Sequence, residues 1–266
     1  MTIPFAQMSF PEMYEQSLVG PLFRPWAKLL LDEVTLSRGE SVLDVACGTG
    51  IVARLARERV GDTGRVVGVD VSPAMLAVAR RVAPSIDWRE GEAAALPRRE
   101  GERFDVVLCQ QGLQFFPDRA AAAREMHHAL APEGRLAVST WRPDEEIPLG
   151  RELRRAAERH LGPILDRRHS FGDGTQLESL LREAGFRDVR SRTVSHTIRF
   201  DDGSAFVRLN AMALAGMSAR SKEMSDEERD RIVEAIVRES DSVAAPYRQG
   251  RTLSYELGAN VATARR

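Results

Sequence analysis

The chain has 266 residues, enough for one large α/β domain with an insertion or for two small domains, and either can bury a full hydrophobic core. Its 38 basic and 39 acidic residues give a formal net charge of -1, which excludes a general electrostatic attraction to nucleic acid or to anionic lipid. Only two cysteines occur, no signal peptide is recognisable, and no uncharged run approaches the roughly 20 residues of a spanning helix, so we expect a cytoplasmic protein without membrane insertion.

Apolar runs alternate with amphipathic runs over the first half of the chain, which is typical of a parallel sheet with helices on both faces. Five strands are predicted, at residues 41–46, 65–70, 86–90, 104–109 and 135–140. Between them, Ser72 before Pro73 predicts the start of one helix. Asp118 predicts the start of an alanine-rich helix that runs to Leu130.

The pattern changes after Trp141, because residues 143–169 are charged and helical without a strand. A capping box of Thr175 and Glu178 then predicts a helix that closes at residue 185, and residues 186–200 alternate as a long strand. A second helical block follows at residues 203–246, with a capping box of Ser225 and Glu228, and residues 252–262 form a last predicted strand.

The stretch SVLDVACGTGIVARLARE, residues 41–58, predicts a strand, a glycine turn and a helix. A helix N-terminus after such a turn suits an anionic pyrophosphate, but Asp44 would oppose that ligand. Two unit charges about 4 Å apart interact by roughly 1 kcal/mol in water and about 4 kcal/mol at an effective dielectric of 20. S-adenosylmethionine removes the conflict, because it carries an amine, a sulfonium and a carboxylate. Asp44 would favour its cationic end, Gly48 and Gly50 would let the backbone approach, and Thr49 would start the helix.

The ends of the next three strands add polar groups at the same edge of the predicted sheet. Asp70 ends the second strand, and its carboxylate can accept both hydroxyls of a ribose, a feature that also fits NAD. Glu92 and a run of small residues follow the third strand and offer a rim for an adenine ring. The stretch FDVVLCQQGLQFFPD ends the fourth strand at the switch point, where open α/β sheets bind ligands.

Taken together, these stretches resemble the class I S-adenosylmethionine-dependent methyltransferases of the small-molecule type, a family that includes the ubiquinone and menaquinone C-methyltransferases. Five stretches match the family's motifs in order: VLDVACGTG, VVGVDVSPAML, GEAAALP, FDVVLCQQGLQFFPD and GRLAVSTW. The resemblance implies an α/β fold with a Rossmann-like sheet, mostly parallel with an antiparallel last strand, helices on both faces and a helical lid or cap. It implies contacts to S-adenosylmethionine at Asp44, Gly48, Thr49, Gly50, Asp70, Val71, Met75, Gly91, Glu92, Ala93 and Gln110.

The resemblance also implies an organisation along the chain. We expect an N-terminal helical lid at residues 1–40, a cofactor-binding core at 41–200 with a helical insertion at 143–170, a helical cap at 203–246, and the last core strand at 250–266. Because such N-terminal segments fold over the donor in this family, Tyr14 and Trp26 are expected near its methionine moiety.

The acceptor side is less well predicted, because the chain departs from the family at residues 114–116, where members often carry histidine, and in the length of the block after Phe200. Acceptor contacts are expected at Gln114, Phe115, Trp141, Phe206 and Met212. His169 and Gln114 are weak candidates for a catalytic role, and no metal is expected. The apolar run AFVRLNAMALAGM predicts either a cavity wall or the contact of a homodimer.

The expected reaction is an in-line methyl transfer to a small-molecule oxygen, nitrogen or carbon atom. The chain has no D/N-P-P-Y stretch after the fourth strand, which argues against methylation of the amino group of adenine or glutamine, and no Pro-Cys pair, which argues against cytosine C5 methylation. A nicotinamide oxidoreductase and a non-catalytic nucleotide-binding module are the alternatives. Asp44 and the lack of a hydride-transfer set disfavour the first, and the aromatic wall and the lid disfavour the second.

Overall fold

The structure is a computed structural model that describes residues 8–266, so the first seven residues of the predicted lid lie outside the described residues. Its strands form one mixed sheet in the order β3-β2-β1-β4-β5-β8-β6, with β7 paired to β8. The strands are β1 (Ser41–Val45), β2 (Arg65–Asp70), β3 (Asp87–Glu90), β4 (Phe104–Gln110), β5 (Leu130–Trp141), β6 (Arg187–Phe200), β7 (Arg248–Gln249) and β8 (Thr252–Arg265). The first five strands run parallel, and β8 runs antiparallel to both β5 and β6. The predicted sheet with an antiparallel last strand is confirmed.

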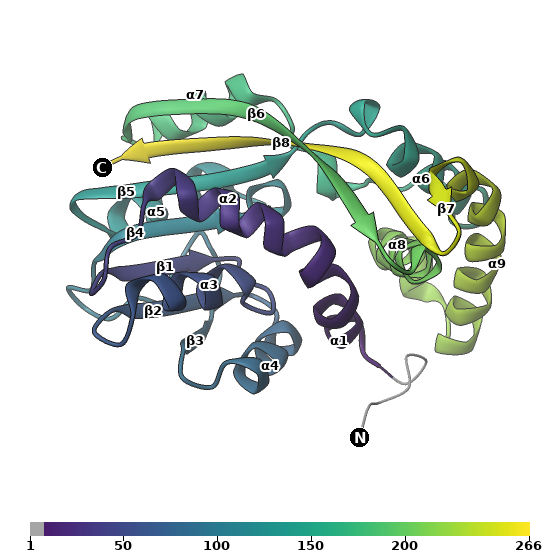
Figure 1. Ribbon diagram of the computed structural model, residues 1–266, viewed down its shortest axis with the longest axis horizontal. Coiled ribbons are helices and arrows are strands. Elements are labelled where there is room, and N and C mark those ends of the chain that lie inside the picture. Colours follow the sequence, from purple (N-terminus) through teal and green to yellow (C-terminus); the bar gives the residue numbers. More distant parts are fainter. Residues whose placement is uncertain (1–7) are drawn as a thin grey trace.

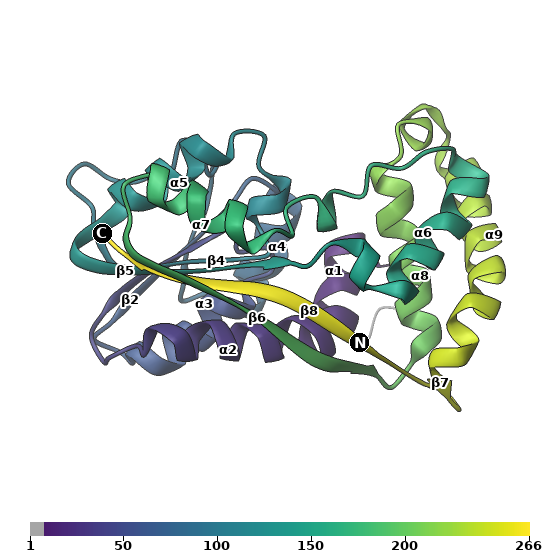
Figure 2. The same ribbon diagram turned by 90° about the horizontal axis from the view of Figure 1, so that it is seen from above.

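Helices cover both faces of the sheet because successive side chains of each buried strand point to opposite faces. Val42 and Val66 pack on one face against α2 (Arg24–Val34) and α3 (Ile51–Val60). Leu43 and Val67 pack on the other face against α5 (Arg119–Ala129) and α7 (Gly174–Glu183). Figure 2 shows these two helical layers on either side of the sheet. The helix α4 (Pro73–Val82) lies beside β3 and completes the first layer.

Two predicted helix starts in the core are confirmed by their capping hydrogen bonds. The hydroxyl of Ser72 accepts a hydrogen bond from the backbone N–H of Met75 at 3.3 Å. The carboxylate of Asp118 accepts one from the N–H of Ala121 at 2.8 Å. These bonds fix where α4 and α5 begin at the cavity edge of the sheet.

The predicted capping box at Thr175 is wrong. Asp173 caps α7 instead, and its carboxylate accepts a hydrogen bond from the N–H of Thr175 at 2.7 Å. Glu178 binds the hydroxyl of Ser191 at 2.6 Å rather than the helix start. Aspartate is the stronger cap, and it stands two residues earlier.

Beyond the core, β6 and β8 continue as a long antiparallel ribbon that curves away and carries a helical unit (Figure 1). This unit contains η4 (Asp144–Glu146), α6 (Pro148–Leu161), η5 (Arg167–His169), α8 (Gly203–Met217), η6 (Arg220–Glu223), α9 (Asp226–Ala244) and η7 (Ala245–Tyr247). Ser225 caps α9, as predicted, by accepting from the N–H of Glu228. The two helical blocks at 143–169 and 203–246 pack together through α6, α8 and α9 around Leu161, Leu214 and Ile236.

The N-terminal segment forms α1 (Phe10–Tyr14), the π-helix η2 (Glu15–Phe23) and then α2. Figure 1 shows α1 between the core and the helical unit, where it contacts both α4 and α8. Met13 and Val19 are buried, so this segment is part of the packed structure. Within residues 8–266, no helix combines the length and the apolarity needed to cross a bilayer.

Candidate active site

A cavity of about 840 Å³ lies beyond the carboxyl ends of the parallel strands, bounded by α8 and by the N-terminal helices. One end is lined by the loops that follow β1, β2, β3 and β4, at residues 44–48, 69–72, 91–94 and 110–112. The other end is lined by side chains of β5, η5, α8 and β8. We call them the loop end and the cap end. The cavity lies at the sheet edge where open α/β folds bind ligands, as the strand order predicts.

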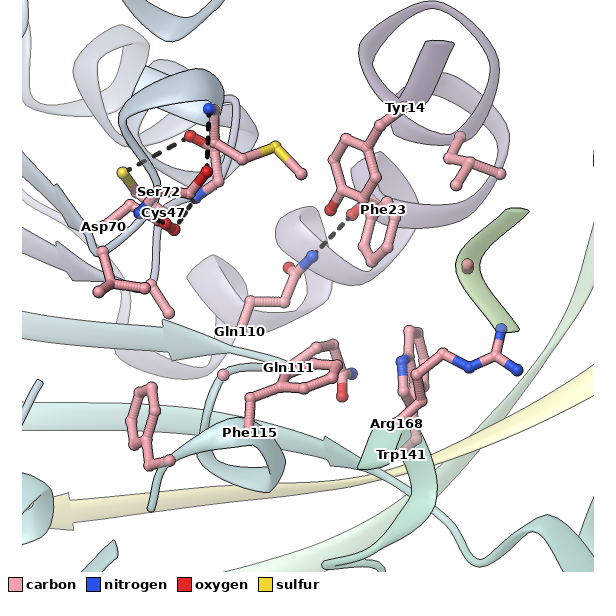
Figure 3. A pocket seen from close by; sticks show the side chains of 18 of the residues that line it. Tyr14, Phe23, Cys47, Asp70, Ser72, Gln110, Gln111, Phe115, Trp141 and Arg168 are labelled. Atoms are coloured by element: carbon pink, nitrogen blue, oxygen red, sulfur yellow. Dashed lines mark hydrogen bonds between the residues drawn. The ribbon is translucent and has the colours of Figure 1, made fainter. Parts of the chain in front are cut away.

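Asp70 ties two loops of the loop end together. One carboxylate oxygen accepts a hydrogen bond from the N–H of Gly48 at 2.8 Å, and the other accepts from the N–H of Ser72, also at 2.8 Å (Figure 3). Burial raises the pKa of Asp70, and these backbone hydrogen bonds oppose the shift. Because each carboxylate oxygen can accept a further hydrogen bond, both retain capacity toward the cavity.

Asp44, near the C-terminal end of β1, lines the same end of the cavity, with only 1% of its surface exposed. One oxygen accepts a hydrogen bond from the N–H of Ala53 at 3.0 Å, and the other has no partner among residues 8–266. Burial raises the pKa of this carboxyl to about 8; the charge of Asp70 adds to the shift, and that of Arg54 opposes it. Without a ligand the carboxyl is therefore mainly neutral at pH 7, and a cation beside it would favour ionisation.

Only part of the glycine turn reaches the cavity. Gly48 lines it with a φ of 55°, but Thr49 and Gly50 lie behind its wall. A Cβ at Gly50 would lie 2.2 Å from the indole of Trp88, so this glycine is required by packing and by its φ of 89°. The helix α3 begins at Ile51 with Gly50 as its cap, so the predicted role of Thr49 as the helix start is wrong. Thr49 is buried with its hydroxyl unpartnered.

Five further predicted cofactor residues line the loop end of the cavity: Val71, Met75, Gly91, Glu92 and Ala93. Val71 and Glu92 are exposed at its rim, and Met75 is half-buried. A Cβ at Gly91 would lie 2.7 Å from the ring of Pro97, so the backbone approaches this proline closely. The rim is therefore built from small and flexible groups.

The N-terminal helices cover this end through Tyr14 and Phe23. The two rings stack with centroids 4.8 Å apart, and the Tyr14 hydroxyl lies next to Gly48. Burial raises the pKa of Tyr14 far above its usual value, so its phenol stays protonated. The side-chain amide of Gln110 donates to the carbonyl of Phe23 at 3.2 Å, while its oxygen is buried without a partner (Figure 3).

Trp26 does not line the cavity, contrary to its predicted place. Its ring packs edge-on against Trp141, with centroids 5.4 Å apart, and against His196 at 4.8 Å. It is fully buried behind the wall, because it lies on the face of α2 that turns to the long β6–β8 ribbon.

The cap end is mainly apolar. Trp141, Phe206, Met212, Leu209, Met217, Tyr255 and Leu257 line it. Phe115, also expected to contact the acceptor, lines the same cavity from η3 (Leu113–Phe115). The apolar run of α8 therefore turns several of its side chains to the cavity. Phe206 packs on Phe200 with ring centroids 4.4 Å apart, which fixes this part of the wall.

The two candidate catalytic side chains differ in position. Gln114 is 2% exposed and does not line the cavity, because the short helix η3 (Leu113–Phe115) turns Phe115 to the cavity instead. His169 does line it, and its Nδ1 lies 2.9 Å from the carbonyl oxygen of Arg142. A carbonyl only accepts, so Nδ1 carries the proton. Burial lowers the pKa of His169, and the neutral ring keeps a lone pair on Nε2.

Gln111, Arg168 and Asn210 also line the cavity, and none of them was a predicted site residue. Gln111 is 6% exposed, has a φ of 54°, and leaves both amide atoms without a partner. Asn210 is also buried, with its side-chain oxygen unpartnered. Arg168 forms an ion pair with Asp166. Gln111 follows Gln110 at the end of a predicted strand, which is the one signal that could have drawn attention to it.

Comparisons with known proteins agree with this geometry. A family model described as a methyltransferase domain matches residues 42–134, which carry the loop end of the cavity. A 2-phytyl-1,4-naphtoquinone methyltransferase from Thermosynechococcus vestitus is 32% identical over 188 residues, covering 64% of this chain and 82% of that protein. A nocamycin O-methyltransferase from Saccharothrix syringae is 31% identical over 205 residues, covering 70% of this chain and 72% of that protein.

Among solved structures, the YcgJ protein from Bacillus subtilis superposes with a TM-score of 0.59 at 19% identity, covering 91% of this chain and 98% of that chain. This likeness shows the fold, and the related sequences add the reaction. From the methyltransferase relatives and the cavity at the switch point, we conclude that the chain belongs to the class I S-adenosylmethionine-dependent methyltransferases that act on small molecules.

Proposed function

We propose that S-adenosylmethionine binds at the loop end of the cavity and that a mainly apolar acceptor binds beside it at the cap end. The observation that carries this proposal is the continuity of one cavity from Asp44 and Asp70 to Phe206 and Met212. Its volume of about 840 Å³ lies in the upper part of the range of about 300–1,000 Å³ for small-molecule sites, and different elements line its two ends. The N-terminal helices and the helical unit of α6, α8 and α9 would act as lid and cap.

In this arrangement Asp70 accepts the two ribose hydroxyls, since both of its oxygens keep capacity after binding Gly48 and Ser72. Asp44 lies beside the cationic methionine end of the donor. The hydroxyl of Tyr14, next to Gly48, lies near the same end. The adenine ring would rest between Met75 and residues 91–93.

When bound, the donor would supply a methyl group that is activated by the sulfonium charge. The acceptor's electron pair would form the new bond to this carbon in line as the bond to sulfur breaks and S-adenosylhomocysteine leaves. The chain's own residues then mainly align the two partners and exclude water. Phe115 and Trp141 supply apolar walls where the two ends of the cavity meet. His169, neutral and with a free Nε2, is our candidate for taking a proton from an acceptor that is not already ionised.

We infer the chemical class of the acceptor from the side chains that line the cap end. Its aromatic and aliphatic wall suits a ring compound with hydrocarbon substituents. One relative is named for 2-phytyl-1,4-naphtoquinone, a fused ring with a long hydrocarbon tail, which fits this description. A screen of reduced naphthoquinones with methyl-labelled donor is the direct assay for turnover.

Calorimetry of S-adenosylhomocysteine and of NAD tests the donor assignment. We expect S-adenosylhomocysteine to bind and NAD to bind far more weakly. Asp70→Ala should weaken S-adenosylhomocysteine binding by about 2–4 kcal/mol, because it removes two charge-assisted hydrogen bonds. Asp70→Asn should lose less of this affinity, because its amide oxygen can still accept a hydrogen bond.

Asp62→Ala is the matched control, because Asp62 is a fully exposed carboxylate on the loop before β2. Its affinity for S-adenosylhomocysteine should equal that of the wild type. If folded Asp70→Ala bound the ligand as tightly as the control, the donor assignment would be wrong.

A further inference from the structure

The cap end of the cavity holds one strongly basic side chain. Among the cavity-lining residues of the described chain, Arg168 is the only arginine or lysine. It belongs to η5, in the segment between α6 and α7. Figure 3 shows it beside Trp141, on the opposite side of the cavity from Asp70 and Ser72. Its position therefore concerns the acceptor rather than the ribose of the donor.

The guanidinium of Arg168 is held in a fixed direction by Asp166. The Asp166 carboxylate accepts hydrogen bonds from Nε at 2.8 Å and from Nη2 at 2.6 Å, and also from the Arg168 backbone N–H at 3.0 Å. The Asp166 side chain is 6% exposed and does not line the cavity. Within residues 8–266, Nη1 makes no hydrogen bond, so N–H groups of the guanidinium remain for a ligand.

A second hydrogen-bond donor lines the same cavity as Arg168. Tyr255 of β8 lines the cavity, with its ring 5.5 Å from that of Phe206. Burial raises the pKa of Tyr255, so its phenol is protonated and can donate, and the charge of Arg168 opposes this shift. Both side chains line the cavity, and no hydrogen bond joins them.

We propose that the acceptor carries an anionic oxygen, either a carboxylate or an ionised hydroxyl, and that Arg168 binds it with Tyr255 as a second donor. Asp166 is the positioning residue that aims the guanidinium. This inference rests on the proposed function, because it concerns the acceptor of the same cavity. A guanidinium in a largely apolar wall orients the acceptor as well as binding it. An uncharged analogue would leave the N–H groups of the guanidinium without a hydrogen-bond partner.

Two matched pairs of probes test the inference on the full chain saturated with S-adenosylhomocysteine. The first pair is 2-naphthoate and the uncharged 2-naphthamide. The second is 2-hydroxy-1,4-naphthoquinone, whose acidic hydroxyl is ionised at neutral pH, and its uncharged 2-methoxy ether. Calorimetry should show that the wild type binds at least one anion about tenfold more tightly than its neutral partner, the effect of a charge-assisted hydrogen bond. The preferred pair identifies the oxygen as carboxylate or hydroxyl.

Arg168→Gln should remove this preference while leaving the affinity for the neutral probe unchanged. Arg168→Lys should keep part of it, because the charge remains but the paired geometry with Asp166 is lost. Tyr255→Phe should reduce it less than Arg168→Gln does. Arg167→Gln is the control, since Arg167 is the exposed neighbour of Arg168 and does not line the cavity.

Three results would overturn the inference. These are no preference for either anion in the wild type, a full preference retained by Arg168→Gln, or a loss of S-adenosylhomocysteine affinity in Arg168→Gln. The last result would assign Arg168 to the carboxylate of the donor. A failure of the donor assignment is distinguishable, because it appears as absent binding of S-adenosylhomocysteine or as insensitivity to Asp70→Ala.

Discussion

The loop end and the cap end of the cavity are built in different ways. The loop end comes from consecutive loops within residues 44–112, and its main polar atoms are fixed by backbone N–H groups such as those of Gly48 and Ala53. The cap end is assembled from remote segments around Trp141, Arg168, α8 and β8, mainly through apolar side chains.

Because of this difference, we expect the two ends to tolerate substitutions to different degrees. Backbone geometry at the loop end tolerates little change, since one added atom can meet a ring or force a residue into a strained conformation. Side-chain packing at the cap end can adjust, particularly where methionines supply the wall. We therefore expect the loop end to be sensitive to small substitutions and the cap end to set acceptor choice with milder effects.

The largest effect is expected at Gly50. Gly50→Ala places a Cβ 2.2 Å from the Trp88 indole and keeps a φ of 89°, so we expect the free energy of unfolding to fall by about 2–5 kcal/mol. Gly216→Ala, at a cap-end glycine with open space around its Cβ position, should change stability by less than about 1 kcal/mol. Urea unfolding measures both. If the two variants had equal free energies of unfolding, the expected difference in sensitivity between the loop end and the cap end would be wrong.

The next effect concerns the charge of Asp44. Its pKa of about 8 means that a cationic ligand must displace a proton at lower pH. The affinity for S-adenosylmethionine should therefore rise by up to about tenfold per pH unit as the pH increases toward 8, and level off above it. S-adenosylhomocysteine, without the sulfonium, should depend on pH less steeply.

Asp44→Asn provides the control for this pH dependence. The amide keeps an oxygen that can accept from the N–H of Ala53, but it cannot ionise. Its affinity for S-adenosylmethionine should be nearly independent of pH over the same range. Calorimetry in buffers of different ionisation enthalpy also counts the released proton, and no proton release below pH 8 in the wild type would argue against a cation at Asp44.

A smaller effect is expected for the aromatic cover of the loop end. Tyr14→Ala removes the ring stacked on Phe23 and should weaken S-adenosylhomocysteine binding by about tenfold, whereas Tyr14→Phe keeps the stack and should lose only a few-fold. Substitution is a cleaner test than truncation through residue 20, because a truncated chain would lose the buried Met13 and Val19. Equal affinities of the alanine variant and the wild type would exclude Tyr14 from the donor site.

The smallest effect is expected at Met212 of the cap end. Met212→Ala removes a half-buried, flexible side chain from the wall and should raise the acceptor KM by about threefold, without changing donor affinity. Size-exclusion chromatography of the same variant checks the alternative that α8 forms a homodimer contact. A shift to monomers with unchanged kinetics per chain would favour the contact over the cavity wall.

Local signals predicted much of the loop end because each depends on a few neighbouring residues. The strands that end at Asp44, Asp70 and Gln110 were readable as apolar runs, and the caps at Ser72 and Asp118 as single side chains before a helix. Parallel strands that end at one edge bring their following loops together, so the cavity's place was predictable as well. The two wrong helix starts, Thr49 at the loop end and Thr175 in α7, arose because a residue one or two positions away caps the helix instead.

The sequence alone determined the sheet, the place of the cavity and the family, since these depend on short-range patterns and on the order of the motifs. Only the tertiary structure decided that Trp26 and Gln114 turn away from the cavity, that Gln111 adopts a positive φ, and that Arg168, paired with Asp166, lines the cavity. The path of the β6–β8 ribbon joins these remote segments, and packing over long separations leaves no local pattern that a sequence could reveal.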